Sequence, residues 1–188
     1  LPIIKQRCEE LLDDERVEGL TFGYKHFWGD YDHYHTGHGW YPNEIRIIRN
    51  HPKIHSWQSA QSFRYFEYYD NPRQEDGHRK LKVLKSGAEI YHYGWVRPPH
   101  LMQTKSKALN TLHWGKKRAE DYYSQAPKDF DYGPMDKIGL FKGTHPEIMR
   151  EMISKHNWKD KLQKTGRRNP HRKPHKHEEL KCIILTWI

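Results

Sequence analysis

Two consecutive prolines, Pro98 and Pro99, divide the sequence into a part with strand patterns and a part with helical patterns. Proline interrupts a strand because it lacks an amide donor, yet the first turn of a helix tolerates it. Before this pair, alternating apolar residues predict strands at 20–26, 44–49, 81–84 and 88–93. After it, helical patterns occur near 100–124 and 145–156. The sequence therefore predicts an α/β fold with a C-terminal helical region.

Two further segments complete this outline. Residues 1–14 place Leu1, Ile4, Cys8 and Leu11 on one face, which predicts an amphipathic helix. Residues 29–43 are rich in Gly, Asp, His and aromatic residues, which is typical of a long loop that forms a site.

The core is expected to depend on aromatic rings. Only 35% of the residues are hydrophobic, but seven Trp, twelve Tyr and six Phe supply large apolar areas. A chain of 188 residues is long enough for one domain with its own core. Two distant cysteines and no long apolar run argue against a disulfide framework and predict a cytoplasmic protein, with contact at the inner face of the membrane as a further expectation.

Positive charge is concentrated at the C-terminal end. Residues 159–188 hold nine Lys and Arg against three acidic residues, which is +6 of the total +9. We therefore expect a folded part at 1–158 and a basic, solvated tail at 159–188. The tail predicts weak contact with a polyanion or an anionic membrane, and a protein that binds nucleic acid is one alternative function.

Four segments, in order, carry a family resemblance: LTFGYKHFWGDYD (20–32), WYPNEIRIIRN (40–50), IHSWQSAQSFR (54–64) and AEIYHYGWVRPP (88–99). Together with DYGPMDKIGLFKGTHPEIMREMISKHNW (131–158), they resemble the C-terminal portion of bacterial family-2-like glycosyltransferases. The resemblance implies part of a GT-A type fold, with a mixed sheet flanked by helices. It also implies transfer of a sugar from a nucleotide diphosphate sugar to a glycan or lipid-linked acceptor. It also implies that the nucleotide-binding half, with its acidic metal-binding motif, precedes Leu1. A truncated, inactive remnant is a second alternative.

The resemblance implies a divalent metal, Mn²⁺ or Mg²⁺, provided that the preceding half is present. His92, at the end of a predicted strand, matches the position of a histidine that completes the metal site in such enzymes. Imidazole is an acceptable ligand for Mn²⁺ among carboxylates. The alternative is a structural histidine packed among Tyr91, Tyr93 and Trp95. His33, His35 and His38 could also bind zinc weakly, although a plain polar loop is the simpler interpretation.

Inverting transfer needs a group that takes the proton from the acceptor hydroxyl. The resemblance implies an acidic residue just before Ala-Gln, and this chain has Ser59 there. A serine is no base at neutral pH, so the candidates become Asp30, Asp32 and Glu44.

Candidate substrate-binding residues fall into three chemical classes. Arginines can pair with a diphosphate, aromatic rings can stack on a sugar, and an amide can hydrogen-bond to one. Ordinary structural roles are the alternative for each, and are favoured for Arg49. The candidates are Arg46, Arg97, Trp40, Tyr41, Trp95 and Gln61.

Overall fold

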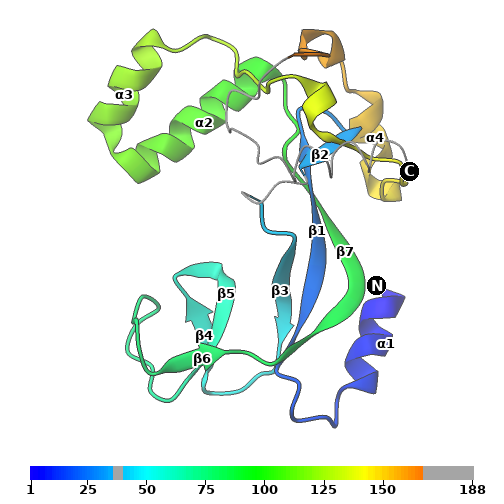
Figure 1. The fold of residues 1–188 in the computed structure, drawn as a ribbon, viewed down its shortest axis with the longest axis vertical. Coiled ribbons are helices and arrows are strands. Elements are labelled where there is room, and N and C mark those ends of the chain that lie inside the picture. The colour runs from blue at the N-terminus through cyan, green and yellow to red at the C-terminus, as the bar shows by residue number, and fades with distance from the viewer. Residues whose placement is uncertain (36–39, 167–188) are drawn as a thin grey trace. The chain divides into compact units, whose positions relative to one another are not determined.

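The computed structural model describes residues 1–35 and 40–166, with the backbone alone for residues 59–61 (Figure 1). The described chain forms two compact units: unit 1 comprises residues 1–25 and 41–91, and unit 2 comprises 26–40 and the chain from His92 onward. The elements confirm a mixed α/β fold with antiparallel sheets and helices. None of the described helices is long and apolar enough to cross a membrane.

The strands are β1 (Gly19–Trp28), β2 (His33–His35), β3 (Asn43–Ile48), β4 (Ile54–Trp57), β5 (Ser59–Phe66), β6 (His78–Lys80), β7 (Val83–Trp95) and β8 (Gly139–Leu140). The α-helices are α1 (Pro2–Glu10), α2 (Pro99–Trp114), α3 (Lys116–Gln125) and α4 (Arg150–Ser154). Three short 3-10 helices are η1 (Met135–Lys137), η2 (Glu147–Met149) and η3 (Lys159–Lys161). Strands β1 and β7 pair with each other, and each contributes residues to both units.

In unit 1, β1 and β3 form an antiparallel pair in which Leu20 lies opposite Ile47. Gly19 is required there because a Cβ atom would lie 2.7 Å from the carbonyl oxygen of Ile47. Strands β4, β5 and β6 form a separate antiparallel sheet, where Tyr65 lies opposite both Ile54 and Arg79.

Two charged side chains, Arg49 and Glu18, stabilise unit 1 through hydrogen bonds between segments distant in sequence. Arg49 donates to the carbonyl oxygens of four residues between 11 and 17, at 2.6–2.9 Å. Glu18 accepts from the guanidinium of Arg79 at 2.6 and 2.8 Å and from the amide of Lys82 at 2.7 Å. Arg49 therefore has a structural role, as expected, through backbone carbonyls.

Aromatic packing organises unit 2, as the composition predicts. Phe27 at the end of β1 is fully buried and stacks on Tyr93 of β7, with ring centroids 4.9 Å apart. Its neighbour Trp28 is also buried and donates its indole proton to the carbonyl of Tyr132 at 2.9 Å. These contacts join the end of β1 to the segment that follows α3.

Several boundaries differ from the sequence prediction. Residues 100–124 form two helices because Gly115, with φ of 83°, ends α2. The two strands predicted at 81–84 and 88–93 are one strand, β7. The helix predicted at 145–156 begins as the 3-10 helix η2 after Pro146 and continues as α4.

The described structure also continues past Trp158. Leu162 in the segment after η3 is buried, and the amide of Met135 donates to the carbonyl of Gln163 at 2.9 Å. The beginning of the predicted tail is therefore packed on unit 2, whereas residues 167–188 lie outside the described part.

Candidate functional site

The clearest polar and aromatic convergence in unit 2 surrounds Trp95 at the end of β7. Lys105, on the second turn of α2, places its ammonium group 5.1 Å from the centroid of the Trp95 ring. The same group donates to the carbonyl of Gly94 at 2.5 Å. Helix α2 can present Lys105 in this way because Pro98 and Pro99 end the strand and begin the helix at once.

Gly94 makes this convergence possible. A Cβ atom built at Gly94 would lie 2.7 Å from Nε2 of His92 and 3.4 Å from Nζ of Lys105. The imidazole and the ammonium group therefore occupy the space that any other residue at position 94 would fill. The YHYGW motif is explained by this close approach.

His92 is paired with a second histidine. Its Nδ1 lies 3.1 Å from Nδ1 of His26, which is buried on β1. One of these two nitrogens must carry the proton of the hydrogen bond and the other must accept it. When His92 is the donor and neutral, its Nε2 holds a lone pair on the side of Gly94 and Lys105.

Three tryptophans line the region beside this histidine pair. The ring centroids of Trp28, Trp40 and Trp95 lie 5.0–5.6 Å from one another. Trp40 also lies 5.0 Å from the ring of His26. Trp28 belongs to the core, whereas Trp40 and Trp95 are half-buried and retain exposed area. We call Trp40, Trp95, His92, Lys105 and the adjacent Arg97 the Trp95 site.

The Trp95 site is positively charged. Burial, together with the positive charge of Arg97, lowers the pKa of Lys105 below its usual range. Arg97 itself is exposed. No carboxylate of the described residues lies within ion-pair distance of Lys105 or Arg97. An anion bound here would relieve the repulsion between the two cations and would favour the charged form of Lys105.

A metal site is not complete among the described residues. No group of three or more His, Cys, Asp or Glu within 1–35 and 40–166 converges on one point. His92 and His26 supply two imidazoles at most, and hard divalent cations prefer oxygen ligands. The described residues therefore do not by themselves fit a Mn²⁺ or Mg²⁺ ion.

Asp30, a predicted proton acceptor, is buried and stabilises the turn between β1 and β2 through hydrogen bonds. Its Oδ1 accepts from the amides of Asp32 and His33, each at 2.9 Å. Both carboxylate oxygens also lie within 3.0 Å of Nδ1 of His33. These contacts account for Asp30 structurally, and its catalytic role stays a prediction.

The other two predicted acids lie in different units. Asp32, in unit 2, accepts from Lys159 at 2.6 Å; burial opposes its ionisation, but this hydrogen bond and the nearby positive charges lower its pKa. Glu44, in unit 1, accepts from Arg46 at 2.6 Å, yet burial raises its pKa. A raised pKa suits a proton acceptor better than a lowered one.

The remaining predicted residues are placed as follows. Arg46 donates to the hydroxyl of Tyr24 at 2.5 Å, and the Tyr24 ring contacts Tyr41 edge-on. These three residues belong to unit 1, with Glu44. The side chain of Gln61 lies outside the described part, as does His38 of the predicted histidine cluster. Of the predicted site residues, His92, Trp40, Trp95 and Arg97 are therefore brought together.

Sequence reasoning did not identify Lys105 or His26. Lys105 is one of two lysines on α2, and only its position six residues after Pro99 indicated that it lies near the strand end. His26 continues the alternation of Leu20, Phe22 and Tyr24, a pattern that predicts one face of a strand and gives no sign of a paired histidine.

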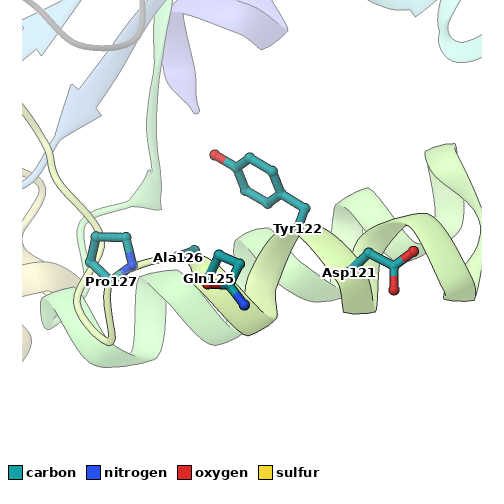
Figure 2. A pocket seen from close by; sticks show the side chains of 5 residues that line it. All are labelled: Asp121, Tyr122, Gln125, Ala126 and Pro127. Atoms are coloured by element: carbon teal, nitrogen blue, oxygen red, sulfur yellow. The ribbon is translucent and has the colours of Figure 1, made fainter.

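A separate surface hollow of about 430 Å³ lies at the end of α3, lined by Asp121, Tyr122, Gln125, Ala126 and Pro127 (Figure 2). Tyr122 and Asp121 leave the helix in different directions, so the polar groups do not converge. We therefore assign no site to this hollow.

Comparison with known proteins gives no family assignment. No protein-family model, curated protein or solved structure matches this chain.

Proposed function

We propose that this chain acts in glycosyl transfer from a nucleotide diphosphate sugar to a glycan or lipid-linked acceptor. The observation that carries the proposal is the ammonium group of Lys105 over the half-buried ring of Trp95, with the positive charge of Arg97 close enough to lower the pKa of Lys105. This observation adds to the ordered motifs that resemble family-2-like glycosyltransferases. One of these motifs, YHYGWVRPP, contributes His92, Trp95 and Arg97 to the Trp95 site.

The chemistry of the site suits a diphosphate attached to a sugar. Guanidinium binds phosphate oxygens in a bidentate manner, and an ammonium group adds a compact positive charge. Because Lys105 is partly buried, its interaction with an anion is screened less than it would be in open solvent. The exposed areas of Trp40 and Trp95 offer apolar surface for a sugar ring.

The proposed reaction is an inverting substitution. The acceptor hydroxyl oxygen attacks the anomeric carbon, the bond from that carbon to the diphosphate oxygen breaks, and the hydroxyl proton passes to a carboxylate. The departing diphosphate takes the electron pair, and Lys105 and Arg97 stabilise its charge. Asp30, Asp32 and Glu44 stay the predicted proton acceptors.

A divalent metal could take part only if ligands other than the described residues help to bind it. If a nucleotide-binding half such as the resemblance implies is present, its carboxylates would bind the ion together with one imidazole, that of His92. No step above depends on this ion.

Release of nucleoside diphosphate from a panel of nucleotide sugars tests the proposal. The chain is incubated with Mn²⁺ and a membrane extract as acceptor source, and Lys105→Gln is compared with Lys107→Gln, which changes an exposed lysine of the same helix. We expect release that falls at least about tenfold in Lys105→Gln alone, the loss of one charge-assisted contact.

The absence of release with every donor would favour the inactive remnant. Equal release from both variants would remove the Trp95 site from the proposal.

A further inference from the structure

The turn between α2 and α3 exposes large apolar side chains. Leu112 is 83% exposed, Tyr122 57% and Trp114 39%. The rings of Trp114 and Tyr122 meet edge-on, with centroids 5.5 Å apart. Exposed apolar groups of this size, gathered at one turn, are unusual for a surface that faces only water.

Cations surround these side chains. Lys116, Lys117 and Arg118 follow the turn directly and are all exposed. The guanidinium of Arg118 lies 5.4 Å from the centroid of the Trp114 ring. Glu120 lies 4.0 Å from Lys116, and the whole segment 99–125 still holds five Lys and Arg against two acidic residues.

Helices α2 and α3 form a helical hairpin that is stabilised by buried residues and by hydrogen bonds between the two helices. Met102 and Ala119 are fully buried. The hydroxyl of Tyr123 on α3 accepts from Asn110 at 2.8 Å and donates to Ser106 at 2.9 Å, so both contacts reach α2. Figure 1 shows α2 and α3 side by side, joined at this turn. The exposed residues are therefore presented by a pair of helices that is held together by buried residues and by these two hydrogen bonds.

We propose that the α2–α3 turn docks on an anionic membrane surface. The apolar side chains of Leu112 and Trp114 would enter the region between headgroups and acyl chains, where tryptophan and tyrosine are favoured. Lys116, Lys117 and Arg118 would contact anionic headgroups. The surface is distinct from the Trp95 site, and the inference does not rest on the proposed function.

Two other occupants fit these residues less well. Nucleic acid would use the cations and rings, but it offers no apolar environment for Leu112. A second copy would bring the same cations against each other, because a two-fold contact pairs a surface with itself. An anionic bilayer satisfies both the apolar and the charged side chains.

Sedimentation of the full chain with vesicles tests the inference. Vesicles of phosphatidylcholine with phosphatidylglycerol are compared with vesicles of phosphatidylcholine alone, at low and high salt. We expect salt-sensitive binding to the anionic vesicles. The double variant Lys116→Gln/Lys117→Gln should lower the partition coefficient about 30-fold, and Leu112→Ser about tenfold.

Matched control variants distinguish the effect of this surface from a general effect of positive charge or of exposed apolar side chains. Lys128→Gln/Lys142→Gln removes two exposed cations elsewhere, and Ile148→Ser changes a side chain that is 86% exposed on η2. Both controls should bind as the unmodified chain does. Circular dichroism should give the same spectrum for all variants.

Four outcomes would overturn the inference. The first is no binding of the unmodified chain to anionic vesicles. The second is equal binding by the turn variants and the controls, which would assign the interaction to the basic C-terminal residues. The third is sedimentation without vesicles that Leu112→Ser abolishes, which indicates self-association. The fourth is single-stranded RNA binding, lost in the double variant, without vesicle binding.

Discussion

Replacing Glu18 by Gln should destabilise unit 1 and alter its response to acid. The Glu18 carboxylate is 11% exposed and accepts three hydrogen bonds, two of them from Arg79. Gln keeps the shape but removes the charge and turns one acceptor into a donor. A hydrogen bond to a charged group contributes about 1.5–3 kcal/mol. Because Arg79 is 43% exposed and water can replace part of the interaction, we expect a loss of about 2 kcal/mol.

The loss should depend on pH in a defined direction. The hydrogen bond from Arg79 lowers the pKa of Glu18 below 4.5, its ordinary value. A carboxyl whose pKa is lower in the folded state contributes its full stability above the unfolded value. The difference between Glu18→Gln and the unmodified chain should therefore be constant near pH 7 and should close as pH falls below 4.5, when Glu18 takes up a proton.

Urea unfolding followed by circular dichroism at several pH values measures this difference. Glu67→Gln is the control, because Glu67 is 68% exposed and lies 3.6 Å from Lys53. That exposed pair should contribute no more than about 0.5 kcal/mol. A Glu18→Gln chain as stable as the control at pH 7, or a difference that widens in acid, would refute the reasoning.

Three further substitutions have defined outcomes. Arg49→Met removes donors to four carbonyls and should cost about 2–3 kcal/mol in urea unfolding. Arg16→Met, which loses an exposed ion pair, should leave the stability almost unchanged, and similar losses for the two variants would contradict the role of Arg49. Phe66→Ala removes a ring that is 1% exposed and should cost about 3–5 kcal/mol, so a loss below about 1 kcal/mol would be contrary to its burial. Gly94→Ala should cost about 1–3 kcal/mol by displacing His92, seen as a shift of the imidazole resonances; unchanged resonances would count against that close approach.

The strands of unit 1 were predictable where alternation is regular. Leu20 and Phe22 are buried on β1, as their spacing indicates. The sheet of β4 and β5 was not predicted, because Trp57, Phe63 and Tyr65 are interleaved with Ser, Gln and Arg. A turn through Gln58, with φ of 59°, joins these strands without a Gly, Pro or Asn signal.

The Trp95 site was predictable in part. The motif around His92 and Trp95 predicted the end of one strand, and Arg97 was predicted with it because it follows Trp95 by two residues. Lys105 could not be predicted as part of the site, because its position over Trp95 depends on the direction that α2 takes after Pro99. The division into two units also had no composition shift to reveal it, since β1 and β7 each continue from one unit into the other.

A titration with inorganic pyrophosphate tests the central claim most directly. Tryptophan fluorescence follows binding because Lys105 lies over the Trp95 ring. We predict a saturable, salt-sensitive change in the unmodified chain, with a dissociation constant at least about tenfold weaker in Lys105→Gln and unchanged in Lys107→Gln. Equal dissociation constants for all three proteins, or no saturable change in any of them, would contradict an anion site at Trp95.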